Sequence, residues 1–251
     1  MTSLWIHGWA SDSRVFETLL AALPPSVAQN ASTVDLPVVG SPNQGLDADS
    51  LYARHIYERI EHEASRGPLL LAGWSMGAMA ALEAAAMAAG RVAALVLISG
   101  CARFVHEANN PVGQDPRAVR TMLNRLGRGS AKVVERFQNS IFAAGEENMR
   151  DLFISGLGNQ YQKIPADTLA HGLDYLMTAD LRPNLNKITC PVLLVHGIRD
   201  TVINLGLAKL LADSLPHARL HALENAGHAP LLSRAGETAG TIVEFIAERQ
   251  G

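Results

Sequence analysis

The chain has 251 residues, of which 48% are hydrophobic and 18% are charged, and its formal net charge is −3. This length is near the upper limit for one hydrophobic core, so we expect one domain with room for an inserted subdomain. The apolar content excludes a disordered chain, and the charge gives no sign of nucleic-acid binding. Two cysteines, Cys101 and Cys190, are too few for a disulfide framework and lack the spacing of a zinc site. We therefore expect reduced thiols, a cytoplasmic location and no metal.

We expect neither a secretory signal at the N-terminus nor a membrane span within the chain. The first residues lack the basic and then apolar pattern of a secretory signal. Residues 67–90 contain Glu83 as their only charge and have the apolar length of a membrane span. The glycines and serine at 73–77 interrupt that segment, and an alanine-rich stretch follows them. A buried strand followed by a buried helix explains both halves better.

Short apolar runs alternate with longer helical patterns over the first hundred residues. The predicted strands are residues 4–7, 32–36, 69–73 and 93–99, and the predicted helices are residues 11–23, 49–65 and 76–89. The strands have no polar face, and the connections between them are long enough for crossover helices. The pattern is typical of an α/β protein whose mostly parallel sheet is covered by helices on both faces.

The pattern changes between residues 101 and 187, where no strands are predicted. Pro116 and Pro165 stand at plausible helix starts, and Gly127, Gly129 and Gly145 at plausible breaks. Strands then resume at residues 191–196 and 219–223, with helices at 205–215 and 235–249. We therefore predict a core formed by residues 1–100 and 188–251, with a helical lid inserted at 101–187.

A Gly-x-Ser-x-Gly pattern occupies residues 73–77, directly after an apolar strand and before a helix. A tight turn between strand and helix needs glycine at its flanks and raises the serine hydroxyl clear of the sheet. Ser75 is therefore the candidate nucleophile. A serine hydroxyl is a weak nucleophile at neutral pH, so it requires a base and a group that orients the base.

Two downstream residues fit those roles. Asp200 follows the strand at 191–196, and His228 follows the strand at 219–223. The chain order Ser, Asp, His is that of α/β-hydrolases, and each member stands at the carboxyl end of a predicted strand. Two alternatives remain open: Asp200 could cap the helix that begins near Asn204, and His228 could belong to a surface loop.

The backbone around the first strand suggests how a reaction intermediate would be stabilised. Residues 7–9 read His-Gly-Trp, and the amide of Trp9 would face the turn at Ser75. The N–H groups of Trp9 and Met76 would then form an oxyanion hole, in which each donor contributes on the order of 3 kcal/mol. Alternatively, Trp9 serves only to fill the core.

These elements resemble the α/β-hydrolase superfamily over nearly the whole chain: His-Gly-Trp (7–9), Gly-Trp-Ser-Met-Gly (73–77), His-Gly-x-x-Asp (196–200) and Gly-His-Ala-Pro (227–230). Residues 73–77, 134–137, 172–174 and 180–182 resemble more closely the biotin-pathway carboxylesterases, which demethylate pimeloyl-acyl-carrier-protein methyl ester. The resemblance implies an α/β-hydrolase fold, a serine esterase without a cofactor, and an acyl channel lined by Trp9, Trp74 and Phe137. Members of the superfamily usually carry a strand pair before the His-Gly strand, and we expect that pair to be absent here.

In that family, basic lid residues hold the acyl carrier protein. Lys132 and Arg136 match two such positions, Arg150 is a looser match, and Arg128 belongs to the same basic run. Lysine at position 132 keeps the charge of the arginine expected there and loses its bidentate geometry. The alternative is that this cluster is only a solvated helix face.

Two other functions are compatible with the same motifs. The protein could hydrolyse another small ester or a carbon–carbon bond, because the triad does not encode the acyl group. It could also be a receptor of the same fold that binds a small ligand with little turnover. An aspartate nucleophile, as in haloalkane dehalogenases, is disfavoured by Ser75.

Overall fold

The computed structural model describes residues 1–38, 50–108 and 110–248. Within these residues six strands form one sheet in the order β2-β1-β3-β4-β5-β6, and every neighbouring pair is parallel. The strands are β1 (Thr2–Ile6), β2 (Ala31–Val34), β3 (Leu69–Trp74), β4 (Val92–Ile98), β5 (Val192–Gly197) and β6 (Ala218–Leu223). The predicted α/β class and parallel sheet are confirmed. Within the described residues, β2 and β6 are the edge strands of this sheet.

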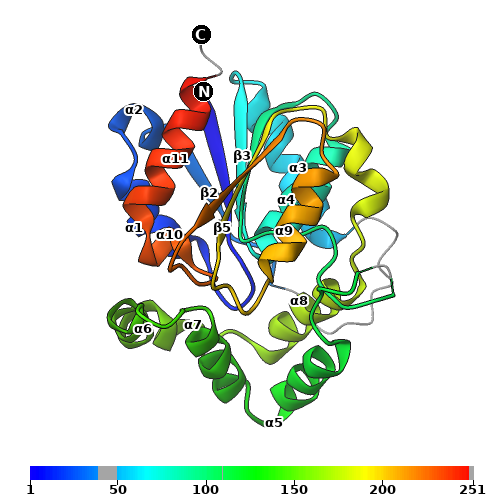
Figure 1. The fold of residues 1–251 in the computed structure, drawn as a ribbon, viewed down its shortest axis with the longest axis vertical. Coiled ribbons are helices and arrows are strands. Elements are labelled where there is room, and N and C mark those ends of the chain that lie inside the picture. The colour runs from blue at the N-terminus through cyan, green and yellow to red at the C-terminus, as the bar shows by residue number, and fades with distance from the viewer. Residues whose placement is uncertain (39–49, 109, 249–251) are drawn as a thin grey trace.

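Helices cover both faces of the sheet, as Figure 1 shows. On one face α1 (Glu17–Ala22) packs against α11 (Ala235–Ala247), and on the other α3 (Leu51–Ala64) packs against α4 (Met76–Met87). The other described α-helices of the core are α2 (Pro25–Ala28), α9 (Leu205–Asp213) and α10 (Pro230–Ser233), and a short 3₁₀ helix at Ser13–Phe16 precedes α1. Positions 49 and 249, the outer limits of two predicted helices, lie outside the described residues.

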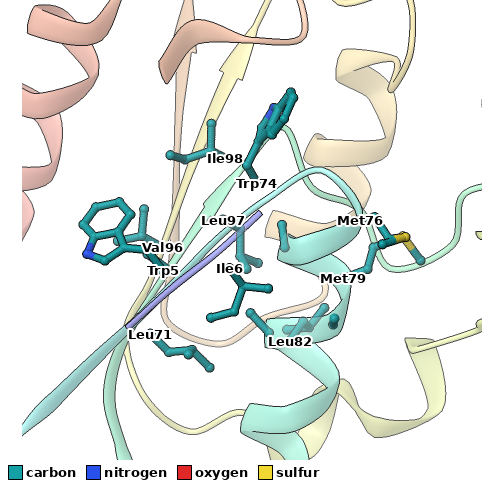
Figure 2. Close-up of a cluster of buried hydrophobic side chains, with 14 of the residues drawn as sticks. Trp5, Ile6, Leu71, Trp74, Met76, Met79, Leu82, Val96, Leu97 and Ile98 are labelled. Carbon is teal, nitrogen blue, oxygen red and sulfur yellow. The ribbon is translucent and has the colours of Figure 1, made fainter. Parts of the chain in front are cut away.

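The apolar segment that resembled a membrane span is β3 followed by α4. All six residues of β3 and nine of the twelve residues of α4 are buried, because the strand is central and the helix is enclosed by neighbours. Figure 2 shows Leu82 of α4 on the same side of the sheet as Ile6 of β1, whereas Trp5 and Val96 project from the opposite face. Across the described ranges, no helix combines the length and apolarity that a bilayer crossing requires.

The segment between β4 and β5 forms a helical layer at the carboxyl ends of the strands, opposite the chain termini (Figure 1). Its described α-helices are α5 (Pro116–Ser140), α6 (Glu147–Phe153), α7 (Asn159–Tyr161) and α8 (Ala166–Thr178), and shorter helical turns lie at Ile154–Gly158 and Arg182–Lys187. We propose that this layer is the lid predicted for residues 101–187, carried by a core of 1–100 and 188–251. The prolines behave as predicted, since Pro116 begins α5 and Pro165 immediately precedes α8.

Two of the three predicted glycine breaks occur. The backbone of α5 leaves helical geometry at Gly129, and Gly145 has a positive φ of 96° in the turn before α6. The predicted break at Gly127 is wrong, because this residue continues the helix. One break is enough to bend α5, and a glycine inside a helix lowers stability without necessarily ending it.

Candidate active site

The turn between β3 and α4 holds Ser75 in a conformation that residues with side chains rarely adopt. Its φ is 57° and its ψ is −121°. The amide of Ser75 donates to the carbonyl of Ile98 at 2.9 Å, which ties the turn to the end of β4. Strained backbone of this kind persists only where the surroundings enforce it, and here it points the hydroxyl away from the sheet.

The flanking glycines of the motif are required by close contacts between backbones. A Cβ atom on Gly73 would lie 2.4 Å from the carbonyl oxygen of Gly77, and one on Gly77 would lie 2.2 Å from that of His7. Neither position can hold a larger residue unless the strand or the helix moves. The pattern Gly-x-Ser-x-Gly therefore lets α4 begin directly against β1 and β3.

The three predicted triad residues lie together in one hydrogen-bonded chain. The hydroxyl of Ser75 donates to Nε2 of His228 at 2.8 Å, and Nδ1 of His228 donates to Oδ2 of Asp200 at 2.7 Å. This assignment follows from the bonding pattern, because a carboxylate only accepts and therefore fixes the imidazole proton on Nδ1. All three side chains are buried. The arrangement can remove a proton from the serine hydroxyl, as nucleophilic catalysis requires.

The structure does not support the alternative roles of Asp200 as a helix cap and of His228 as an exposed loop residue. Oδ1 of Asp200 accepts from the amides of Val202 and Ile203, both at 2.8 Å, whereas α9 is capped by Asn204. The His228 side chain is completely buried, although the loop after β6 that carries it also has exposed residues. Local bonds hold Asp200 through Oδ1, and its Oδ2 is the atom that accepts from Nδ1 of His228.

A second histidine, His196, also contacts the carboxylate of Asp200, a contact that was not predicted from the sequence. Its Nε2 lies 2.8 Å from the carbonyl oxygen of Ile203 and 3.3 Å from Oδ2 of Asp200. Burial by itself would raise the pKa of Asp200, but the attraction of His228 and the bonds from His196 and His228 hold it below its ordinary value. Asp200 is therefore ionised at neutral pH. The signal in the sequence was His196 itself, four residues before the aspartate at the end of a buried strand.

Trp74 has a different role from the one predicted. It was expected to line the acyl channel, but its side chain is 1% exposed and is not part of the cavity wall. Its indole Nε1 instead donates to the carbonyl oxygen of His228 at 2.8 Å, and its ring lies 5.7 Å from the imidazole ring. Because β3 is central and buried on both faces, the residue before Ser75 points into the core and supports the histidine loop.

The predicted oxyanion donors follow β1 and begin α4. Within the described residues, the backbone amides of Trp9 and Met76 have no hydrogen-bond partner in the protein. The indole of Trp9 donates to the carbonyl of Leu169 at 2.9 Å, which fixes the ring against the lid layer. Its ring also meets that of Phe137 edge to face at 4.9 Å. Trp9 thus packs as a core residue while its amide remains available, so the two alternatives for it are compatible.

A cavity of about 240 Å³ lies between the core and the helical layer. Its wall includes Ser75, Trp9 and Phe137, together with apolar side chains such as Val133 and Leu176. The predicted channel residues Trp9 and Phe137 therefore reach it. An apolar cavity with one reactive hydroxyl in its wall is suited to an acyl chain. No set of three or more His, Cys, Asp and Glu side chains within the described ranges could hold a metal ion.

The predicted docking residues divide between two helices. Arg128, Lys132 and Arg136 are exposed on α5, and no acidic group in the described part of the chain lies within ion-pair distance of them. Of the three, only Arg136 also lines the cavity. Arg150 is on α6 and pairs with Asp151 at 2.9 Å. Arg128, Lys132 and Arg136 therefore lie on the same helix, whereas Arg150 lies on another helix and forms an ion pair there.

The fold and the Ser-His-Asp geometry are those of an α/β hydrolase, and a sequence model of the alpha/beta hydrolase family matches residues 4–241. The chain therefore belongs to that family. It is 32% identical over 231 residues to the pimeloyl-[acyl-carrier protein] methyl ester esterase of Nitrosomonas europaea, a match that covers 91% of this chain and 88% of the relative. The enzyme of the same name from Yersinia pseudotuberculosis is 28% identical over 246 residues, covering 98% of this chain and 93% of the relative.

Solved structures agree with this assignment at the level of the fold. An esterase from Exiguobacterium antarcticum superimposes with a TM-score of 0.84 and 22% sequence identity, over 98% of this chain and 92% of that one. At this identity the likeness shows the shared architecture, and the substrate has to be argued from the site.

Proposed function

We propose that the protein is a serine carboxylesterase that hydrolyses the methyl ester of a pimeloyl chain borne by acyl carrier protein, a step of biotin synthesis. The observation that carries the proposed chemistry is the buried bonding chain from Ser75 through His228 to Asp200 beside an apolar cavity. The names of the two relatives, matched over nearly their full lengths, support the proposed substrate. The acyl carrier protein is then the partner, and the cytoplasm the location.

The reaction proceeds in two halves. In the first, Oγ of Ser75 attacks the ester carbonyl while Nε2 of His228 takes the hydroxyl proton, and the amides of Trp9 and Met76 stabilise the anionic oxygen. The carbon–oxygen bond to the methoxy group breaks, and His228 returns the proton so that methanol leaves. Asp200 stabilises the transient imidazolium and keeps its orientation.

In the second half, water hydrolyses the acyl-enzyme. His228 removes a proton from the water as its oxygen bonds to the acyl carbon, and the proton then passes to Oγ of Ser75 as the acyl–serine bond breaks. The products are the free carboxylic acid on the carrier and the restored serine. These steps require no cofactor. Trp9 and Phe137 line the channel for the acyl chain, and Arg128, Lys132, Arg136 and Arg150 form the docking face.

The first prediction tests the nucleophile. Ser75→Ala should reduce hydrolysis of pimeloyl-carrier methyl ester by about 10⁶-fold, because the serine and its base act as a unit. Mass spectrometry of the carrier-bound product measures the reaction. The control is Ser99→Ala, since Ser99 is also a buried serine with a positive φ, at the end of the adjacent strand β4. This control should remain active, and substantial turnover by Ser75→Ala would rule out the assignment.

A substrate panel separates the proposed function from its alternatives. Wild-type protein is compared on carrier-bound pimeloyl methyl ester, free small methyl esters, a p-nitrophenyl ester and a carbon–carbon bond substrate. Preference for the carrier-bound ester supports the proposal. Equal or better turnover of another class points to a different hydrolase, and binding without turnover of any of them points to a receptor.

A further inference from the structure

Residues 140–146, which comprise the last residue of α5 and the segment that joins it to α6, contact the loop that carries His228 directly. The amide of His228 donates to the carbonyl oxygen of Ile141 at 2.8 Å. The preceding amide, of Gly227, donates to Oε2 of Glu146 at 3.1 Å, and the same oxygen accepts from the amide of Ala143 at 2.7 Å. One carboxylate oxygen thus joins the segment to the histidine loop.

The contact leaves no space for a side chain on the histidine loop. A Cβ atom on Gly227 would lie 2.7 Å from the amide nitrogen of Ala143 and 2.8 Å from the carbonyl oxygen of Ile141. The two backbones therefore touch, and their relative position is set by hydrogen bonds and not by adaptable side-chain packing. A displacement of the segment would move His228 with it.

The same segment also touches the residues on both sides of Asp200. Nη1 of Arg199 donates to the carbonyl oxygen of Ala144 at 3.2 Å, and the hydroxyl of Thr201 donates to that of Ser140 at 3.3 Å. These two bonds are formed by exposed groups, whereas Glu146 is only 5% exposed. Glu146 is therefore the buried side chain among those that make these contacts.

Glu146 is an unusual choice for a purely structural position. Its Oε1 is buried and has no hydrogen-bond partner within the described residues. A buried carboxyl group with an unsatisfied oxygen reduces stability, and an apolar side chain would avoid that loss. Only a side chain of this length that ends in an acceptor can bond to the amides of Ala143 and Gly227 at the same time.

We propose that Glu146 is a positioning residue that, through Gly227, holds His228 at hydrogen-bond distance from Ser75. The inference rests on the proposed function in so far as Ser75 and His228 are the reacting pair. A general base must be held within a few tenths of an ångström of its productive position, so loosening its loop lowers the rate of the chemical step. Glu146 does not line the cavity, and substrate binding should therefore be unaffected.

The test compares three variants on a p-nitrophenyl ester, which needs no carrier. Glu146→Ala should lower kcat by about tenfold or more with KM within about twofold, because binding is preserved and the base is displaced. Glu146→Gln should recover most of kcat, since one amide oxygen can accept both N–H bonds. The matched control is Glu147→Ala: Glu147 is the next residue, is exposed, and accepts from the amide of Gly145, with no bond to the histidine loop among the described residues.

Three outcomes would overturn the proposal: wild-type kcat in Glu146→Ala, an equal loss in Glu147→Ala, or no recovery in Glu146→Gln. Should Glu146→Ala fail to fold, Glu146→Asp replaces it, because the shorter side chain cannot reach both amides. Hydrogen exchange of the wild-type protein provides an independent reading, in which the Gly227 amide must be protected. An unprotected Gly227 amide would contradict the proposal whatever the variants do.

A fluorophosphonate probe separates this inference from the proposed function. Its reaction with Ser75 depends on the Ser75–His228 pair and not on the natural ester. If wild-type protein reacts quickly with the probe but does not hydrolyse carrier-bound pimeloyl ester, the proposed substrate is wrong. The positioning role is then still decided by the labelling rates of Glu146→Ala, Glu146→Gln and Glu147→Ala, which should follow the order expected for kcat.

Discussion

His7 shows how a single buried side chain shapes the loop beside the active site. Its Nδ1 donates to the carbonyl of Gly8 at 2.8 Å, and its Nε2 accepts from the amide of Leu36 at 2.9 Å. The hydroxyl of Ser11 donates to the same Gly8 carbonyl at 2.9 Å. This turn places the amide of Trp9, the predicted oxyanion donor. Protonation of Nε2 would remove the acceptor that Leu36 uses.

Burial lowers the pKa of His7 below its ordinary value, an effect only partly opposed by its bond to Gly8 and by Asp35. As the pH falls below about 6.5, His7 in the unfolded chain therefore takes up a proton before His7 in the folded protein. The unfolded state then binds more protons, so the free energy of unfolding decreases with decreasing pH.

The prediction at this scale is that His7→Gln has a weaker pH dependence of stability. Glutamine can offer an acceptor near the position of Nε2 but cannot titrate. Urea unfolding at pH 7 and pH 5 measures the effect: the wild-type protein should lose more of its free energy of unfolding between these values than the variant. His171, whose pKa burial also lowers, is present in both proteins and does not alter the comparison. Equal losses would show that His7 does not contribute.

At the scale of elements, the position of Ser75 depends on how closely α4 approaches β1. The start of α4 has no side chain at Gly77, and the carbonyl oxygens of Ile6 and His7 occupy the place where a Cβ would be. The helix therefore packs backbone to backbone against the strand. A rigid junction of this kind keeps the Ser75 turn in its strained conformation, since neither element can relax without separating from the other.

Gly77→Ala should destabilise the protein by about 1–3 kcal/mol or more, because the new methyl group meets backbone atoms that cannot rotate away. It should also lower kcat, because the displaced helix carries the amide of Met76. Thermal or urea unfolding measures the first effect and ester hydrolysis the second.

Gly240→Ala is the matched control for that substitution. Gly240 lies inside α11, is exposed, and has open space where a Cβ would be. Alanine there should stabilise the protein by about 0.5–1 kcal/mol through its higher helix propensity and leave activity unchanged. A destabilisation of both variants by similar amounts would contradict the argument from close backbone contact.

At the scale of the whole molecule, charge is distributed unevenly. The protein has a net charge of −3, yet residues 117–136 carry six basic groups and only one acidic group, Glu135. These residues belong to α5, which lies at the carboxyl ends of the strands and borders the cavity. A basic surface beside the cavity would attract an acidic partner and orient it toward Ser75.

Charge reversal of Lys132 and Arg136 to Glu should therefore raise KM for a carrier-bound methyl ester by about fivefold or more at low salt, an effect that salt should diminish. Hydrolysis of a free small methyl ester should change less than that of the carrier-bound ester, because Ser75, Asp200 and His228 lie outside α5 and only Arg136 of the two reversed residues also lines the cavity. Steady-state kinetics on both esters at two ionic strengths measures this. Equal losses on both esters would indicate a damaged lid, and no loss on either would show that the cluster is a solvated face.

Most elements of the sheet and the three candidate catalytic residues could be predicted from the sequence, because both follow local patterns. The apolar runs predict β3 and β5, and the helical periodicity predicts α4. Ser75, Asp200 and His228 each follow a predicted strand, in the order expected of a hydrolase triad. The role of Trp74 could not be predicted, since the same residue next to the nucleophile could face the cavity or the core. Its orientation depends on which side of β3 the histidine loop lies.

The sequence by itself determined the α/β class, the parallel sheet and the choice of Ser75, Asp200 and His228 as candidate catalytic residues. The first two follow from hydrophobic periodicity, and the third follows from residue order. Only the tertiary structure decided which groups support them. His196 stands in the His-Gly-x-x-Asp motif, but the motif does not show that its Nε2 reaches Asp200. Glu146 and the carbonyl of Ile141 bond to the histidine loop from positions that are distant in the chain and carry no motif. Such contacts are set by how separate loops and the lid layer meet above the sheet, and hydrogen-bond partners across that junction leave no periodic signal in the sequence.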